Sequence, residues 1–307
     1  MAVEPQMNSA DRAFDVPLQT HRASDGYELF YRLWIPVGRE PRGRILALHG
    51  IQSHSGWYTA SCRQLAEEGF EVWFPDRRGS GRNVRERGDV RNVGRWFDDL
   101  DEFIALMSRD ENGQPGRDRL PGFLLGLSWG AKLAVAHAVA RPFDWRGMIL
   151  LYPGIQTRVR VKGWQHRAIA LLYRLGLKRL KISIPLSDPA LFTRRPEARQ
   201  MIEQDRWALH QVTISFLYAA LQLDRLALGG PQHLDLPVIC QLAGDDEIVD
   251  QAKTKTYLRQ FAEDRLTVLE YPGARHTLEF EPNREQITGD LIQWLERVSS
   301  PKGSRPV

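Results

Sequence analysis

The chain has 307 residues, of which 42% are hydrophobic and 26% are charged, a composition ordinary for a globular protein with a sizeable core. Its formal net charge of +4 permits contact with anionic surfaces but does not require a nucleic-acid partner. The two cysteines, Cys62 and Cys240, are too few for a disulfide scaffold or a cysteine-ligated zinc site. Residues 1–16 have no apolar core, unlike a signal peptide, and no apolar run reaches the ~20 residues of a membrane-spanning helix. We therefore expect a cytoplasmic protein in which both cysteines are buried thiols.

Short apolar runs alternate with amphipathic stretches along most of the chain. The first two runs are joined by Ser24-Asp25-Gly26, which predicts a hairpin. The expected strands cover residues 18–23, 27–35, 44–50, 71–75, 123–127, 147–152, 237–243 and 266–271. The expected helices cover residues 57–69, 95–109, 134–138, 251–262 and 284–298. This alternation predicts a mostly parallel sheet with helices on both faces.

Residues 155–234 break the alternation. They contain several helical stretches punctuated by prolines and no convincing strand, and about eighty residues are too many for a loop. Ligands of open α/β sheets bind at the carboxyl edge of the strands, so we expect this helical insertion to cap that edge. The predicted organisation is a flexible N-terminal tail (1–15), a first core part (16–154), the cap (155–234), a second core part (235–298) and a C-terminal tail (299–307).

One serine has the surroundings of a nucleophile. Ser128 stands at the centre of Gly126-Leu127-Ser128-Trp129-Gly130, between a predicted strand and a predicted helix. In a G-x-S-x-G elbow the serine is held in a strained turn, and flanking glycines leave room for the close approach of strand and helix. A serine hydroxyl also needs an adjacent base and a third group that orients the base.

His276 is the predicted base, because it follows the last expected strand and its loop should meet the elbow at the same sheet edge. The acid should follow a strand too, and residues 245–250 hold four carboxylates directly after one. Composition does not choose among them, although Asp250 is well placed to cap the next helix.

Acyl transfer also needs donors for a developing oxyanion. One is expected to be the backbone N–H of Trp129, and the other should come from the loop at residues 49–54. For His49 and His54 in that loop, packing or hydrogen-bonding roles are favoured over metal binding, since no carboxylate or cysteine has ligand spacing nearby.

Two stretches rich in basic residues could bind nucleic acid or a membrane surface. Seven arginines between positions 77 and 95 favour a solvated loop paired with acidic residues at 89, 98 and 99 over a binding patch, and nucleic-acid binding is not expected. Residues 164–181 have a basic amphipathic pattern, typical of membrane surfaces, in which Ile169, Leu172, Leu175 and Leu180 are the apolar members. Peripheral membrane contact through the cap is therefore one hypothesis, and inward packing of these cap helices is its alternative.

Taken together, five ordered segments resemble the alpha/beta-hydrolase superfamily, and within it the monoacylglycerol lipase and lysophospholipase group (serine aminopeptidase S33-like, Hydrolase_4). Residues 49–58 resemble the H-G-x-x-x-H-S-x-R-Y signature of that group, and residues 76–81 resemble its D-x-x-G-x-G loop. The elbow, the G-x-D-x-I-V-D acid loop at 244–250 and the histidine loop at 272–276 complete the match, which runs from about residue 20 to residue 298.

The resemblance implies an alpha/beta-hydrolase fold with an eight-stranded sheet and a helical cap. It implies a catalytic triad of Ser128, Asp246 and His276, with Asp245 as the main rival acid, and oxyanion amides at Ile51 and Trp129. The implied activity is that of a serine carboxylesterase on a small ester with an acyl chain, with no cofactor and no metal. An aminopeptidase, thioesterase, acyltransferase or non-catalytic binding protein is the alternative.

The sequence departs from the group at two positions. Trp129 stands where the group often has Met, and Trp57 stands where it usually has Arg. We expect both changes to reshape the lining of the pocket more than its chemistry, with Trp129 narrowing the acyl site.

Overall fold

The computed structural model describes residues 16–108, 120–158 and 163–299. In these ranges eight strands form one sheet in the order β1-β2-β4-β3-β5-β6-β9-β10. The pairs β1–β2 and β2–β4 are antiparallel, and every other neighbouring pair is parallel. The strands of this sheet are β1 (Gln19–Arg22), β2 (Glu28–Trp34), β3 (Gly43–Leu48), β4 (Phe70–Pro75), β5 (Gly122–Leu127), β6 (Gly147–Leu151), β9 (Val238–Ala243) and β10 (Leu266–Tyr271). The predicted mostly parallel, eight-stranded sheet is confirmed.

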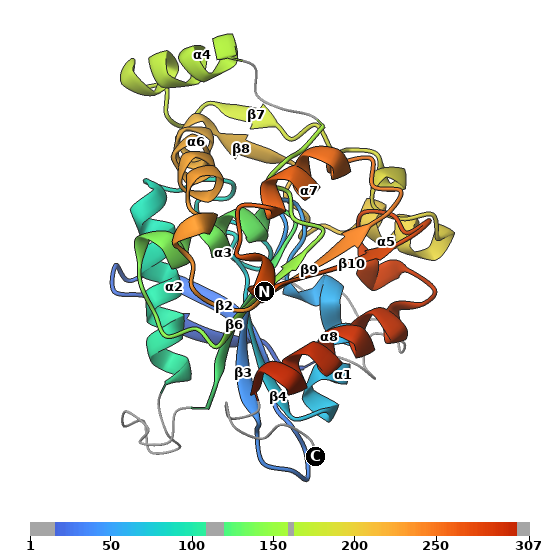
Figure 1. Ribbon diagram of the computed structural model, residues 1–307. Helices are drawn as coiled ribbons and strands as arrows, with labels where there is room; N and C mark the ends of the chain where they lie inside the picture. The colour runs from blue at the N-terminus through green and yellow to red at the C-terminus, as the bar shows by residue number, and fades with distance from the viewer. Residues whose placement is uncertain (1–15, 109–119, 159–162, 300–307) are drawn as a thin grey trace.

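Helices cover both faces of the sheet, with α2 and α3 on one side and α1 and α8 on the other (Figure 1). The α-helices are α1 (Thr59–Glu67), α2 (Val93–Met107), α3 (Trp129–Ala140), α4 (Gly163–Arg174), α5 (Pro196–Gln204), α6 (Ile214–Gly229), α7 (Gln251–Leu258) and α8 (Arg284–Ser299). Short 3-10 helices are η1 (Ser55–Tyr58), η2 (Pro189–Leu191), η3 (Pro231–His233), η4 (Glu263–Arg265) and η5 (Leu278–Phe280). Because helices lie on both faces, a central strand such as β5 is buried from Phe123 to Leu127, and this explains its run of apolar residues and glycine.

The segment between β6 and β9 differs from its prediction in one respect. It contains β7 (Lys181–Ser183) and β8 (Gln211–Thr213), which pair antiparallel in a small sheet of their own. The expectation of no strand here is therefore wrong. Each strand is only three residues long, which is too short to show an alternating pattern in the sequence.

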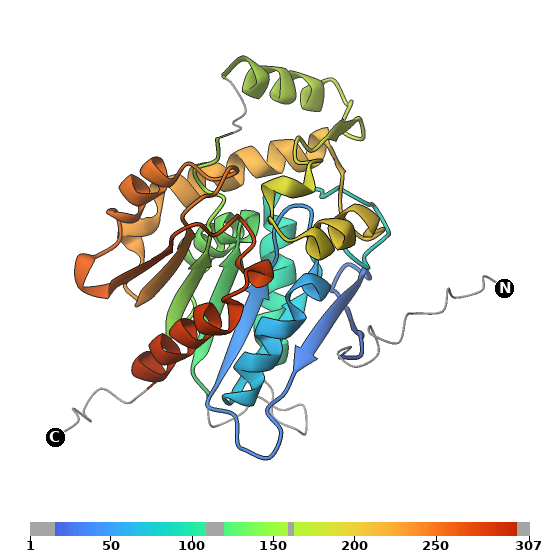
Figure 2. The ribbon, with the colours of Figure 1, turned by 90° about the vertical axis from the view of Figure 1, so that its right-hand side faces the viewer.

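This segment lies against the carboxyl edge of the main sheet, where α4 and β7 stand beyond the ends of the parallel strands in both ribbon views (Figure 2). Three backbone hydrogen bonds of 2.9 Å join it to loops at that edge. Leu209 N–H donates to Gln52 O after β3, Thr213 N–H donates to Gly88 O after β4, and Thr277 N–H after β10 donates to Phe192 O.

Other boundaries shift slightly. The helix expected to end at residue 262 ends at Leu258, and α1 is preceded by η1. Asp250 caps α7, as predicted, by accepting a hydrogen bond from the N–H of Lys253. The expected N-terminal tail at 1–15 lies outside the described residues. The expected C-terminal tail at 299–307 also lies outside them except for Ser299, which is the last residue of α8. Within the described ranges no helix has both the length and the apolar character needed to cross a bilayer.

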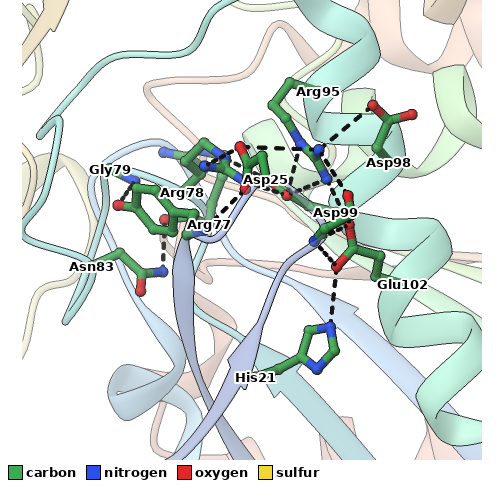
Figure 3. A network of polar contacts seen from close by, with 12 residues as sticks. His21, Asp25, Arg77, Arg78, Gly79, Asn83, Arg95, Asp98, Asp99 and Glu102 are labelled. Atoms are coloured by element: carbon green, nitrogen blue, oxygen red, sulfur yellow. Dashed lines mark hydrogen bonds and ion pairs between the residues drawn. The ribbon is translucent and has the colours of Figure 1, made fainter.

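Charged side chains tie the N-terminal hairpin to α2 (Figure 3). Arg78 pairs with Asp99 at 2.7 Å and with Asp25 at 3.1 Å, and Arg95 pairs with Asp99 at 2.9 Å. The predicted pairing of the arginine-rich stretch with Asp99 is confirmed. The expectation of a solvated loop is wrong for Arg77 and Arg78, whose side chains are buried.

Candidate active site

Ser128 stands at the sharp turn between β5 and α3, and its φ of 51° lies in the left-handed region. The two neighbouring glycines make this turn sterically feasible. A Cβ on Gly126 would lie 2.5 Å from the Cα of Ala131, and a Cβ on Gly130 would lie 2.0 Å from the carbonyl oxygen of Leu48. Any side chain at either position would collide with backbone, so strand and helix approach this closely only with glycine there.

His276 joins Ser128 to Asp246. Its Nε2 lies 2.8 Å from Ser128 Oγ, and its Nδ1 lies 2.7 Å from Asp246 Oδ2. A carboxylate only accepts hydrogen bonds, so Nδ1 carries the imidazole proton and the Nε2 lone pair faces the serine hydroxyl. The ring is buried, and the rings of Tyr152 and Phe192 pack edge-on against it with centroid distances of 4.9 and 6.0 Å.

The four carboxylates of the acid loop have four different partners. Asp246 is buried, and its Oδ1 accepts hydrogen bonds of 2.8 and 2.9 Å from the backbone N–H groups of Ile248 and Val249. Asp245 points to the surface and pairs with Arg194 at 2.8 Å. Glu247 pairs with Arg275, and Asp250 caps α7. Of these four, Asp246 is the carboxylate that contacts His276.

The two residues whose amides are expected to hold an oxyanion belong to the start of α3 and to the loop after β3, which both approach Ser128. Trp129 is the first residue of α3, so its N–H has no acceptor within the helix. The other side is formed by the loop after β3, since a Cβ on Gly50 would lie 3.8 Å from Ser128 Oγ. Ile51, the next residue, is thus held close to the serine by the chain itself.

His49 and His54 make hydrogen bonds, as expected. His49 Nδ1 donates to Gly50 O at 2.7 Å, and its Nε2 accepts from the N–H of Arg77 at 2.8 Å. Burial lowers the pKa of His49 to about 3, which keeps the ring neutral and able to accept. His54 Nε2 contacts Asp205 Oδ2 at 3.0 Å. In the part of the chain that the structure describes, no group of three His, Cys, Asp or Glu side chains is arranged to hold a metal ion.

The two tryptophans that depart from the family pattern are both buried. The indole of Trp57 donates to Asp205 Oδ2 at 2.6 Å and so links η1 to the segment after α5. The indole of Trp129 packs against the rings of Trp96 and Phe216, with centroid distances of 5.1 and 5.5 Å. The side chain beside the serine therefore fills a space between α2 and α6.

Sequence reasoning missed two residues near this site, Asp205 and Arg77. Asp205 lies where the resemblance to the family is weakest, and a single acid in a helical insertion gives no motif. Arg77 was grouped with the surface arginines, although its position directly after the apolar strand β4 is a signal of burial. Burial lowers the pKa of its guanidinium to about 9, so it remains a cation at neutral pH.

The chain is similar to known proteins over most of its length. The family model described as "Hydrolase_4: Serine aminopeptidase, S33" matches residues 39–283. The chain is 22% identical over 271 residues to "Monoacylglycerol lipase" of Mycolicibacterium smegmatis, covering 88% of this chain and 93% of the relative. It is 25% identical over 285 residues to "Monoglyceride lipase" of Rattus norvegicus, covering 92% of this chain and 91% of the relative.

Solved structures share the fold. A monoglyceride lipase from Saccharomyces cerevisiae in complex with a substrate analog superposes with a TM-score of 0.80 at 23% identity, covering 98% of this chain and all of that one. The monoacylglycerol lipase of Paleococcus ferrophilus gives a TM-score of 0.76 at 21% identity, covering 88% of this chain and 99% of that one. The family match spans most of the sequence, and the alpha/beta-hydrolase fold agrees with it. The chain belongs to the serine aminopeptidase S33 (Hydrolase_4) family.

Proposed function

We propose that this ester hydrolase cleaves its substrates through an acyl-enzyme on Ser128, and that those substrates are monoacylglycerols or lysophospholipids. The observation that supports the mechanism best is the unbroken path of hydrogen bonds from Ser128 Oγ through His276 to Asp246. The lipid substrate class is supported by relatives named monoacylglycerol lipase and "Phospholipase YtpA", the latter from Bacillus subtilis and 24% identical over 261 residues.

In the proposed reaction, Ser128 Oγ attacks the carbonyl carbon of the ester while His276 Nε2 takes its proton. The amides of Ile51 and Trp129 donate to the oxyanion of the tetrahedral intermediate. Collapse of this intermediate releases the alcohol, which receives the proton from His276, and leaves the acyl group on the serine. Water, deprotonated by His276, then attacks the acyl-enzyme to form a second tetrahedral intermediate. Its collapse releases the fatty acid, and His276 returns the proton to Ser128 Oγ. Asp246 holds the Nδ1 proton throughout and stabilises the imidazolium.

Residues 155–234 are proposed to form the cap over this site, between core parts at 16–154 and 235–298. The support is the set of backbone hydrogen bonds to the loops after β3, β4 and β10, together with the contact of Asp205 with His54 and Trp57.

The outer face of α4 is the proposed membrane contact. Trp164 and Leu171 lie on the same side of this helix, and Leu175 directly follows its last residue. The three side chains are 66%, 56% and 65% exposed. The sequence pattern included Ile169 among the apolar residues expected to contact the membrane, but its side chain is only 7% exposed and faces inward. Basic residues flank the exposed ones and would meet anionic headgroups: Arg167, Arg174, Lys178, Arg179 and Lys181.

Flotation with vesicles of phosphatidylcholine and phosphatidylglycerol tests this contact. The double variant Trp164→Asp/Leu171→Asp should lose most vesicle binding and keep its activity on a short, water-soluble ester. Val84→Asp, which changes an exposed apolar residue in the loop after β4, is the matched control and should float like the wild type. Equal flotation of the double variant and the wild type would end the membrane proposal.

The reaction itself is tested with a chain-length series. Monoacylglycerols and p-nitrophenyl esters of increasing acyl length are compared with amino-acid anilides and acyl thioesters, with Ser128→Ala as the blank. We expect ester cleavage that improves with acyl length and disappears in the blank. Cleavage of anilides or thioesters alone would favour the aminopeptidase or thioesterase alternative.

We also propose a cytoplasmic location, supported by Cys62 and Cys240, which are both free and buried. Free thiols are typical of a reducing compartment. Recovery of the protein in the cytosolic and peripheral-membrane fractions of cells is the expected result, and its recovery with secreted proteins would contradict the proposal.

A further inference from the structure

Arg77 contacts the loop after β3 in a way that the proposed reaction does not use. Its Nη1 donates to Gly50 O at 3.2 Å and its Nη2 donates to Ile51 O at 3.0 Å. Among the described residues, the polar partners of this side chain are backbone carbonyls and not carboxylates. Burial of this cation carries a desolvation cost, which the nearby carboxylate of Asp76 offsets in part, while the hydrogen bonds of the guanidinium go to the two carbonyls.

The hydrogen bond to Gly50 fixes the direction of a neighbouring amide. Gly50 C=O and Ile51 N–H belong to one trans peptide unit, in which the two groups point to opposite sides. The Gly50 oxygen is held by Arg77 Nη1 and by His49 Nδ1, so the Ile51 N–H must point the other way. Glycine at position 50 makes rotation of this peptide easy, and two donors on its carbonyl oppose that rotation.

The same guanidinium also contacts the other oxyanion residue. The Cζ of Arg77 lies 4.5 Å from the centroid of the Trp129 ring and 5.5 Å from that of Phe216. Cation–π contacts of this kind are strengthened by burial. One side chain therefore fixes the peptide before Ile51 and packs on the residue that starts α3.

We propose that Arg77 is a positioning residue that holds the oxyanion hole in its donating conformation. This inference rests on the proposed function, because Ile51 and Trp129 are the proposed oxyanion donors. Arg77 does not touch the reacting atoms. It acts through the Gly50–Ile51 peptide and the Trp129 ring, and without it the peptide can rotate and turn a carbonyl oxygen toward the developing negative charge.

The next residue provides a matched control. Arg78 is also buried, but its guanidinium is turned away toward Asp99 and Asp25 and lies 4.1 Å from the centroid of the Tyr27 ring (Figure 3). Arg77→Met and Arg78→Met thus remove adjacent buried cations, one from the oxyanion loop and one from a structural ion pair.

The test measures kcat, KM and the Ki of a trifluoromethyl ketone, a transition-state analogue that forms an oxyanion on the serine. For Arg77→Met we expect kcat to fall roughly a hundredfold, the cost of losing one oxyanion donor, with KM little changed and Ki raised by a similar factor. Arg77→Lys keeps the positive charge but lacks the guanidinium that donates to two carbonyls at once. Its kcat and Ki should therefore lie between those of Arg77→Met and those of the wild type. Arg78→Met should lower the melting temperature and keep the kcat and Ki of the wild type.

Wild-type ester cleavage separates the two claims. If the wild type does not cleave esters, the proposed function fails. If the wild type cleaves esters but Arg77→Met keeps the wild-type kcat and Ki, only the positioning role is overturned. The positioning role is also overturned if kcat falls as much in Arg78→Met as in Arg77→Met. Should Arg77→Met fail to fold, Arg77→Lys decides the matter, because a purely structural role predicts a lower melting temperature with an unchanged Ki.

Discussion

The carboxyl edge of the sheet and the outer face of α4 differ in the burial and hydrogen bonding of their side chains. At the sheet edge, Asp246 and His276 are buried, and both carboxylate oxygens of Asp246 and both ring nitrogens of His276 have a partner within 3 Å. On α4, the large apolar side chains of Trp164 and Leu171 are exposed. The first region has the preorganisation that proton transfer requires. The second has the exposed apolar area that adsorption to a lipid surface requires.

The largest expected effect lies within the acid loop. Asp246→Asn should lower kcat about 10³–10⁴-fold, because an amide in place of the carboxylate favours the wrong imidazole tautomer. Asp245→Asn, one residue away, removes only a surface pair with Arg194 and should have nearly wild-type kcat. Steady-state kinetics on a soluble ester checks both. Similar losses in the two variants would contradict the assignment of Asp246.

The elbow glycines should show the next largest effect. Gly130→Ala places a methyl group against Leu48 O and should lower the free energy of unfolding by about 3 kcal/mol. Gly289→Ala meets open space in the middle of α8 and should raise it by about 0.5–1 kcal/mol. Urea denaturation measures the two changes. A stable Gly130→Ala protein with full activity would show that the elbow is less constrained than its geometry indicates.

A smaller effect is expected from Glu279, which lies three residues beyond His276 in η5. Its carboxylate accepts from the N–H groups of Ala60 and Ser61 at the start of α1, yet burial raises its pKa to about 7 from an ordinary 4.5. The folded state therefore binds the proton more tightly, and stability is lost as the pH rises from about 4.5 to about 7.

Glu279→Gln removes this titration. The melting temperature of the wild type should fall more between pH 5 and pH 8 than that of the variant, as followed by circular dichroism. An identical pH dependence in the two proteins would contradict the raised pKa.

The two regions also differ in how far the sequence could predict them. Ser128 and His276 could be named before the structure from the elbow and from the loop after the last strand. Asp246 could be chosen among four carboxylates only through the resemblance to the acid loop of the family. The orientation of α4 could not, because an amphipathic pattern does not say which side meets the protein, and Ile169 proved to face inward. The strands β7 and β8 are too short to leave a pattern. Arg77 and Asp205 act through partners distant in the chain, and no local spacing encodes those contacts.

The central claim, that Ser128 is the nucleophile of an ester hydrolase, is tested most directly by a fluorophosphonate probe. Mass spectrometry of the wild type should show one covalent adduct on the peptide carrying Ser128, with ester hydrolysis lost in proportion to labelling. Ser128→Ala should remain unlabelled and inactive while keeping its fold. A well-folded wild-type protein that hydrolyses esters but carries no adduct on Ser128 would contradict the account.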